Sequence, residues 1–128
     1  MSELQAFFAE NVENDIVEEV VISKRFKDKN GKPIPWKIKA IGEDVNTELR
    51  KSCTKKVKIK NGVFMNETDQ EAYLAKLAVE CVVFPDLRNA ELLQSYGVMA
   101  PEELVKKMLL PGEYGTLLEK IQELNNLI

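Results

Sequence analysis

The spacing of apolar residues changes once along the chain, near Thr68, and this change limits the fold more than any other feature. Before it, apolar residues and lysines alternate over short stretches, as residues do in strands. After it, apolar residues recur every three or four positions, which indicates amphipathic helices. The sequence therefore predicts an α+β fold, with a small antiparallel β-hairpin sheet in the N-terminal half and a cluster of short C-terminal helices.

The length of 128 residues is typical of one domain, predicted here over residues 1–128 with a β-rich part at about 16–66 and a helical part at about 68–127. Apolar residues make up 45% and charged residues 30%, a balance found in soluble globular proteins. The longest apolar runs are far shorter than the ~20 residues that cross a bilayer, and the first residues are acidic. We expect neither a signal peptide nor a membrane span.

Two hairpins and a short helix are predicted in the first half of the chain. The first hairpin joins residues 16–23 to residues 34–40, with Trp36 on its buried face. The second turns at Asn61-Gly62, a dipeptide that readily takes positive φ. In both hairpins the lysines are expected on the face opposite the apolar one. The remaining elements of this half are a helix at about 44–53 and one or two helical turns carrying Leu4, Phe7 and Phe8, ended by Asn11, Asn14 and Asp15.

Helix boundaries in the second half are predicted from capping residues. Thr68 and Glu71 have the spacing of a capping box, so Thr68 is the expected N-cap of the first helix. Its apolar stripe would comprise Tyr73, Leu74, Leu77, Ala78 and Cys81, and Pro85 would close it. Later boundaries are expected at Asp86 or Asn89 (N-cap), Gly97 (C-terminal end), Pro101 (first helical position) and Pro111-Gly112 (break).

Residues that carry catalysis or bind metals are scarce in this sequence. Histidine is absent, which removes the commonest general base and metal ligand at neutral pH. Cys53 and Cys81 are far apart and belong to no CxxC pair. Carboxylates occur as adjacent pairs such as Glu102-Glu103, whose side chains point apart, and no glycine-rich loop has P-loop spacing. The sequence predicts a binding protein without a cofactor or a metal, and not an enzyme.

The middle of the chain is basic although the whole carries a net charge of −3. Residues 23–60 hold thirteen Lys or Arg against four Asp or Glu, between two acidic flanks. One interpretation is a small nucleic-acid-binding adaptor that uses the Lys-rich segment 24–60. A second is a solvated strand face whose lysines protect an exposed sheet edge, which we favour, so nucleic acid is not the expected partner. A third is attraction to an acidic protein or to the acidic flanks of a second copy.

Apolar side chains of the C-terminal helices are the best candidates for a partner-binding surface. Most of them are expected in the core, because short amphipathic helices bury their stripes on each other and on the sheet. Met and Tyr suit adaptable contacts with partner helices, so Tyr96, Met99, Met108 and Tyr114 are expected to face outward. The full candidate set is Leu93, Tyr96, Met99, Met108, Leu109 and Tyr114.

Three stretches of this region carry a resemblance to a known family. They are Phe84-Pro85-Asp86-Leu87-Arg88-Asn89, Leu92-Leu93-Gln94-Ser95-Tyr96-Gly97-Val98 and Met108-Leu109-Leu110-Pro111-Gly112-Glu113-Tyr114, followed by an amphipathic segment. With the upstream Pro-x-Trp strand and the Cys-bearing helix, the chain resembles the XkdN-like tail assembly chaperones of phages and prophages of Gram-positive bacteria. The resemblance covers most of the chain.

The resemblance implies a non-catalytic chaperone in the cytoplasm of the bacterial host. Its expected client is the long, helical tape measure protein, which it would keep soluble while tail tube subunits polymerise around it. Tail tube subunits are a further expected partner, as are other copies of the chaperone, because several copies would cover one client. Covering apolar helical stripes needs shallow apolar grooves rather than a reactive pocket.

Overall fold

The computed structural model describes residues 2–13 and 16–128 of the chain. Its main sheet has three antiparallel strands in the order β1-β2-β5. They are β1 (Val17–Val20), β2 (Trp36–Lys39) and β5 (Val82–Phe84). The pairing of β1 with β2 confirms the first predicted hairpin. Strand β5 was not predicted, because its apolar residues continue the stripe of the preceding helix in the sequence.

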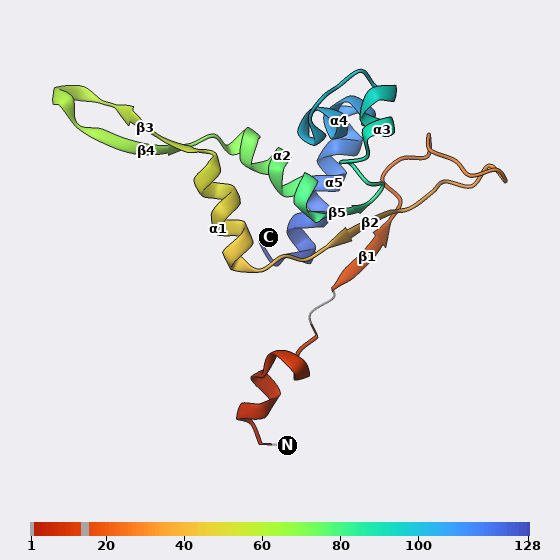
Figure 1. Ribbon diagram of the computed structural model, residues 1–128, viewed down its shortest axis with the longest axis horizontal. Helices are drawn as coiled ribbons and strands as arrows, with labels where there is room; N and C mark the ends of the chain where they lie inside the picture. Colours follow the sequence, from red (N-terminus) through yellow and green to blue (C-terminus); the bar gives the residue numbers. More distant parts are fainter. Residues whose placement is uncertain (1, 14–15) are drawn as a thin grey trace.

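The helices lie mainly in the second half of the chain, which confirms the α+β fold class (Figure 1). Helix α2 lies between α1 and the α4–α5 pair, and α5 also contacts β2. The helices are α1 (Glu43–Ser52), α2 (Gln70–Cys81), α3 (Ala90–Ser95), α4 (Pro101–Met108) and α5 (Pro111–Leu124).

The core is built around α2 and the buried face of β2. Leu77, Ala78 and Cys81 of α2 are fully buried, as predicted for its apolar stripe. Ala75 and Val79 are buried as well, because α2 contacts α1, α4, α5 and β5 and so has neighbours on more than one side. The remaining fully or almost fully buried side chains include Trp36, Ile38, Leu87, Leu104, Val105, Leu117 and Ile121.

The N-terminus of α2 differs from the predicted capping box. The side chain of Asp69, not that of Thr68, accepts the hydrogen bond from the Ala72 backbone amide at 3.1 Å. Thr68 instead ends a strand, and its hydroxyl lies 2.7 Å from the hydroxyl of Thr54 on the paired strand. The predicted cap was wrong by one residue because the cross-strand partner of Thr68 competes for its side chain.

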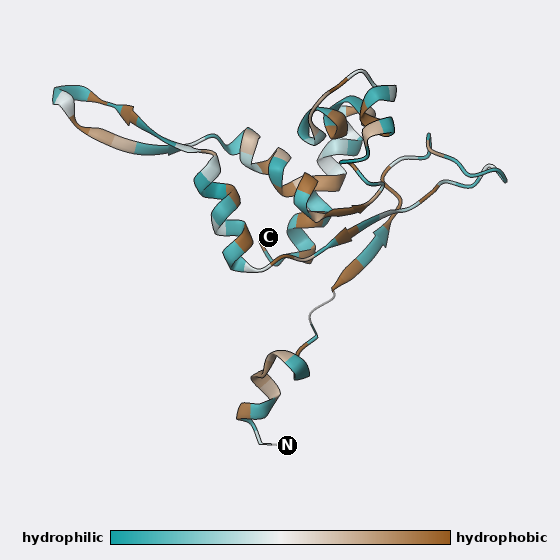
Figure 2. Ribbon diagram, in the orientation of Figure 1, coloured by the Kyte–Doolittle hydropathy of each residue, from teal (hydrophilic) through white to brown (hydrophobic). Residues whose placement is uncertain are grey.

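A second, two-stranded sheet projects from the body between α1 and α2 (Figure 1). Strands β3 (Thr54–Lys58) and β4 (Phe64–Thr68) are antiparallel and turn at Asn61 and Gly62, which have φ of 64° and 73°. This confirms the predicted Asn-Gly hairpin. Ile59, Val63, Phe64 and Met65 of this hairpin are all exposed. Figure 2 shows hydrophobic residues among hydrophilic ones along the hairpin.

The later capping predictions hold. Asn89 caps α3 by accepting from the Leu92 amide at 2.9 Å, and Gly97 follows α3 with φ of 69°. Pro101 and Pro111 occupy the first positions of α4 and α5. No helix of residues 2–13 and 16–128 is long and apolar enough to cross a membrane.

The N-terminal residues form two short 3-10 turns, Leu4–Phe7 and Ala9–Asn11, where one or two helical turns were predicted. Leu4, Phe7 and Phe8 are exposed, and Figure 1 shows this part standing away from the sheet and the helices. Asn11 ends the second turn, whereas the predicted terminators Asn14 and Asp15 lie outside the described residues.

Candidate functional site

An apolar pocket of about 220 Å³ lies where the β1–β2 connection meets the chain after β5. Every lining side chain is apolar apart from one tyrosine hydroxyl. The lining residues are Phe26, Ile34, Trp36, Phe84, Pro85, Leu92, Tyr96 and Met108. They come from distant parts of the sequence, so only the folded chain makes the pocket.

The pocket has an aromatic wall and an open rim. Trp36, 2% exposed, is anchored in β2, and its ring packs against Phe26 with centroids 6.3 Å apart and planes tilted by 52°. Phe84 ends strand β5 opposite Lys37 of β2, and 47% of it is exposed. A partly exposed aromatic beside a buried one gives a surface on which an apolar side chain of a partner could pack.

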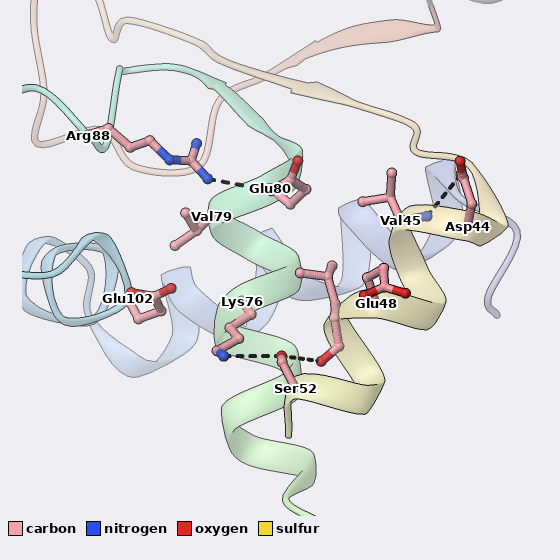
Figure 3. A pocket seen from close by; sticks show the side chains of 10 residues that line it. Asp44, Val45, Glu48, Ser52, Lys76, Val79, Glu80, Arg88 and Glu102 are labelled. Atoms are coloured by element: carbon pink, nitrogen blue, oxygen red, sulfur yellow. Dashed lines mark hydrogen bonds and ion pairs between the residues drawn. The ribbon is translucent and has the colours of Figure 1, made fainter. Parts of the chain in front are cut away.

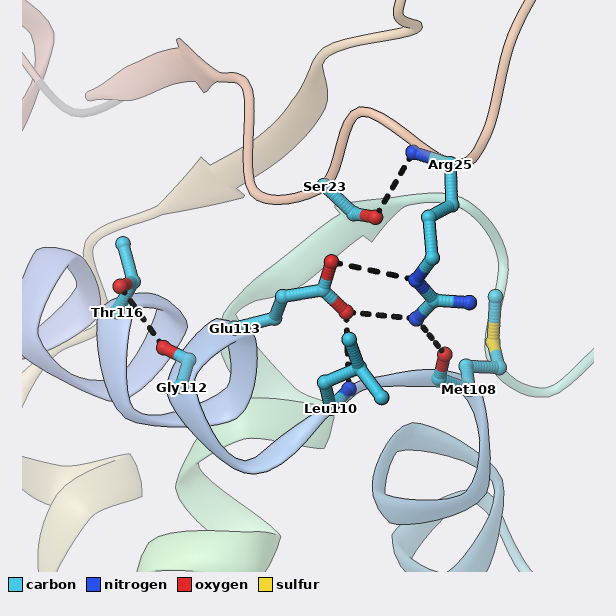
Figure 4. A network of polar contacts seen from close by, with 7 residues as sticks. All are labelled: Ser23, Arg25, Met108, Leu110, Gly112, Glu113 and Thr116. Carbon is cyan, nitrogen blue, oxygen red and sulfur yellow. Dashed lines mark hydrogen bonds and ion pairs between the residues drawn. The ribbon is translucent and has the colours of Figure 1, made fainter.

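An ion pair joins the β1–β2 connection to the junction of α4 and α5 (Figure 4). Nη2 of Arg25 donates to Oε1 of Glu113 at 2.6 Å and Nε donates to Oε2 at 3.3 Å, so the contact is bidentate. The same Nη2 donates to the Met108 carbonyl at 2.7 Å. Oε1 of Glu113 also accepts from the Leu110 amide at 2.9 Å, which fixes the start of α5.

These contacts stabilise the charged form of both partners. Hydrogen bonds from Arg25, Ser23 and the Leu110 amide hold the pKa of Glu113 at about 2. The hydrogen bond to Glu113 raises the pKa of Arg25, whose guanidinium also lies 5.1 Å from the centroid of the Phe26 ring. Because Met108 and Phe26 both line the pocket, the ion pair braces two of its walls against each other.

A larger hollow of about 530 Å³ lies between α1 and α2, with Arg88 and Glu102 at its edge (Figure 3). Four of its polar side chains form two pairs: Lys76 Nζ donates to Ser52 Oγ at 3.1 Å, and Arg88 Nη2 lies 3.4 Å from Glu80 Oε2. Nowhere in residues 2–13 and 16–128 do three or more acidic, Cys or His side chains group as metal ligands. The charged side chains that line this hollow are of both signs.

The structure divides the six predicted partner-binding residues among different environments. Tyr96 and Met108 both line the apolar pocket. Tyr96 is half-buried, but Met108 is only 5% exposed, so the expectation that it faces outward was wrong. Met108 ends α4 and belongs to the buried core cluster as well as to the pocket lining. Leu109 is buried and Leu93 packs against the core.

Met99 and Tyr114 do not line the pocket. Met99 faces outward as expected and is 92% exposed. Tyr114 is half-buried, and burial raises the pKa of its hydroxyl, which has no hydrogen-bond partner among the described residues. These six residues therefore do not form one surface.

Two apolar surfaces were not predicted from the sequence. Six of the eight pocket residues were not proposed as a site, although Phe84-Pro85 and Trp36 belong to the stretches that carried the family resemblance. The exposed tip of the β3–β4 hairpin was also missed. Its signal was the run Val63-Phe64-Met65: three consecutive apolar residues cannot all lie on one face of a strand.

The basic segment does not form one continuous patch. Lys27, Lys29 and Lys32 lie on the β1–β2 connection, whereas Lys55, Lys56, Lys58 and Lys60 lie on the β3–β4 hairpin. These two arms extend toward opposite ends of the molecule's long axis (Figure 1). A nucleic acid that needs clustered cations would meet only one group at a time.

Together, the fold and the site define a small α+β protein with an open apolar pocket and two protruding arms. The chain belongs to the phage XkdN-like tail assembly chaperone family, whose model matches residues 4–127. This confirms the resemblance found in the sequence. Membership makes the chain a phage tail assembly chaperone and indicates a non-enzymatic role.

Individual relatives are similar over most of this chain. The chain is 38% identical over 108 residues to the uncharacterized protein YqbN of Bacillus subtilis strain 168, covering 84% of this chain and 72% of that protein. It is 36% identical over 107 residues to the phage-like element PBSX protein XkdN of the same strain, covering 83% and 72%. The crystal structure of the protein YqbN superposes with a TM-score of 0.84 at 34% identity, over 98% of each chain.

Proposed function

We propose that this chaperone binds the tape measure protein of its phage in the host cytoplasm and keeps it soluble while the tail tube is assembled. In this role it acts by binding alone, without catalysis. The apolar pocket carries the proposal, because a chaperone of a helical client needs an accessible site for apolar side chains.

The shape and composition of the pocket suit the client. An amphipathic helix presents apolar side chains three or four residues apart, and one or two of these fill a hollow of about 220 Å³. Burying one large apolar side chain stabilises a complex by roughly 1.5–3 kcal/mol before the entropy of association is subtracted. A single pocket therefore gives weak, reversible binding, as expected of a protein that must later release its client.

The Arg25–Glu113 ion pair supports the same role. It holds the β1–β2 connection against the α4–α5 junction, so the pocket is formed before a client arrives. A preformed site loses less conformational entropy on binding than one that must be assembled.

Co-expression with the tape measure protein of the same phage tests the proposal. We expect the client in the soluble fraction only when this chain is present. Phe84→Ser should abolish this effect, because Phe84 lines the pocket. Val83→Ser is the matched control: Val83 directly precedes Phe84 in β5, is 46% exposed against 47% for Phe84, and does not line the pocket.

Two outcomes would contradict the proposal. If the client is equally soluble with and without the chaperone, the chain does not have the proposed function. If the Phe84→Ser and Val83→Ser variants keep the client soluble equally well, the client does not bind at the pocket. Thermal unfolding of both variants would show that each is folded.

A further inference from the structure

Two protruding parts of the chain carry apolar side chains together with opposite charges. The first is the N-terminal segment, residues 2–13, which contains Glu3, Glu10 and Glu13 and no Lys or Arg. The second is the β3–β4 hairpin, residues 54–68, which contains four lysines and the single acid Glu67. Neither part lines the apolar pocket.

Both parts expose large apolar side chains. In the N-terminal segment Phe7 is 80% exposed, and Leu4 and Phe8 are exposed beside it. In the hairpin Phe64 is 60% exposed, and Ile59, Val63 and Met65 are exposed around it. Clusters of exposed apolar residues rimmed by charge usually mark contacts with another protein.

Each part has a defined local structure that could be recognised. In the N-terminal segment the Gln5 amide donates to Ser2 Oγ at 3.3 Å and Asn11 Nδ2 donates to the Gln5 carbonyl at 2.8 Å, which hold the 3-10 turns. In the hairpin the strands pair from Thr54 opposite Thr68 to Lys58 opposite Phe64. A partner would therefore meet ordered apolar surfaces.

Within one copy the two parts lie apart. The N-terminal segment extends to one side of the sheet, while the hairpin extends from the far ends of α1 and α2 (Figure 1). The complementary surfaces of a single chain therefore do not meet in this structure. A second copy offers the matching surface to each of them.

We propose that the N-terminal segment of one copy docks on the β3–β4 hairpin of a second copy. Leu4, Phe7 and Phe8 then pack on the apolar tip of the hairpin, with the three glutamates facing Lys55, Lys56, Lys58 and Lys60. Because each copy has one donor segment and one acceptor hairpin, the contact joins two copies by reciprocal docking or links more copies head to tail. The contact is small, so we expect a dissociation constant of about 1–100 μM.

Charge reversal with rescue tests the docking. Self-association of the full chain is measured by sedimentation at about 50 mM salt, where exposed charges are weakly screened. Glu3/Glu10/Glu13→Lys should weaken it at least about tenfold, as should Lys55/Lys56/Lys58→Glu. A one-to-one mixture of these two variants should associate again, since the reversed segment now matches the reversed hairpin.

Controls separate this contact from general charge and apolar effects. Glu103/Glu119/Glu123→Lys makes the same change of charge at exposed helical positions and should leave association unchanged. Phe7→Ser and Phe64→Ser should each weaken association, whereas Met99→Ser, at a side chain that is 92% exposed elsewhere, should not. Equal effects of the control and test variants would overturn the proposal, as would a chain that stays monomeric at about 0.1 mM.

Cross-linking identifies which copies are joined. A carbodiimide links carboxylates to amines that lie in contact, so a mixture of unlabelled and nitrogen-15-labelled chains should give mixed-isotope links between the N-terminal glutamates and the hairpin lysines. Links found only within one isotope would mean that the segment folds onto its own hairpin and would overturn the proposal. The result is independent of client binding, because neither part lines the pocket.

Discussion

The two hairpins of this chaperone have similar sequence patterns but differ in the burial of their apolar residues. Each has one strand in which apolar residues alternate with lysines, and a turn that contains Asn-Gly. The β1–β2 hairpin forms part of the main sheet and buries Trp36 and Ile38, whereas the β3–β4 hairpin leaves its apolar residues exposed. Alternation therefore specifies a strand but not whether anything covers its apolar face.

The difference lies in the neighbours of each hairpin. Strand β2 is central, between β1 and β5, and α5 packs on it. Strands β3 and β4 pair only with each other among the described strands, and a two-stranded ribbon is marginally stable by itself. It is held at its base, where the Asp69 amide donates to the Cys53 carbonyl at 2.8 Å and Thr54 meets Thr68.

The largest expected contrast comes from removing one aromatic side chain in each hairpin. Trp36→Ala should lower the free energy of unfolding by about 3–5 kcal/mol, because it leaves a cavity in the core. Phe64→Ala should change it by less than about 0.5 kcal/mol, since that ring is exposed. Urea denaturation at low protein concentration measures both. Equal losses would mean that the hairpin packs on the body in solution.

The contact between α1 and α2, at the base of the β3–β4 hairpin, gives the next largest effect. The Tyr73 hydroxyl donates to Asn46 Oδ1 in a buried hydrogen bond. Asn46→Ala should lower the free energy of unfolding by about 1–3 kcal/mol, because the hydroxyl loses its acceptor. Asn66→Ala, at an exposed position of β4, is the control and should have little effect. Comparable losses of unfolding free energy in the Asn46→Ala and Asn66→Ala variants would show that the buried hydrogen bond contributes nothing to stability.

The ion pair that braces the first hairpin should make stability depend on pH. Glu113 has a pKa of about 2 when folded, below its usual value of 4.5. A lowered pKa stabilises the folded chain above the usual value, and this stabilisation is lost as pH falls from about 4.5 toward 2. Arg25→Ala should flatten this part of the profile.

Arg88→Ala is the matched control, because Arg88 is an exposed arginine paired with Glu80 at 3.4 Å in a single contact. Denaturation midpoints at about pH 6 and about pH 3 are compared for the three proteins. Identical pH profiles for the Arg25 variant and the unmodified chain would show that the ion pair does not brace the fold.

The smallest effect concerns the turn glycines. Gly31 and Gly62 have φ of 78° and 73°, so alanine at either position is strained by about 1 kcal/mol. For Gly31→Ala we expect this loss in global stability. For Gly62→Ala we expect a smaller global loss and faster amide exchange in β3 and β4, because that hairpin can open while the core stays folded. Equal amide-exchange rates in the two hairpins of the Gly62→Ala variant would contradict the expectation that the β3–β4 hairpin opens by itself.

Local features of the fold were readable from the sequence because they depend on near neighbours. Asn89, Gly97 and Pro101 act within one helical turn, and their predicted roles are confirmed. The predicted role of Thr68 as a helix cap was wrong because its hydrogen-bond partner, Thr54, lies 14 residues away in the sequence. The predicted exposure of Met108 was wrong because it depends on what packs against α4, which helical spacing cannot reveal.

By itself, the sequence determined the α+β class, the turns, most helix ends and, through its motifs, membership of a tail assembly chaperone family. Only the tertiary structure decided which apolar faces are covered, added strand β5 and joined Arg25 to Glu113 across 88 positions of the chain. Propensity and capping are local properties written in short stretches of sequence, whereas the pocket and the exposed hairpin depend on contacts between residues far apart in the chain.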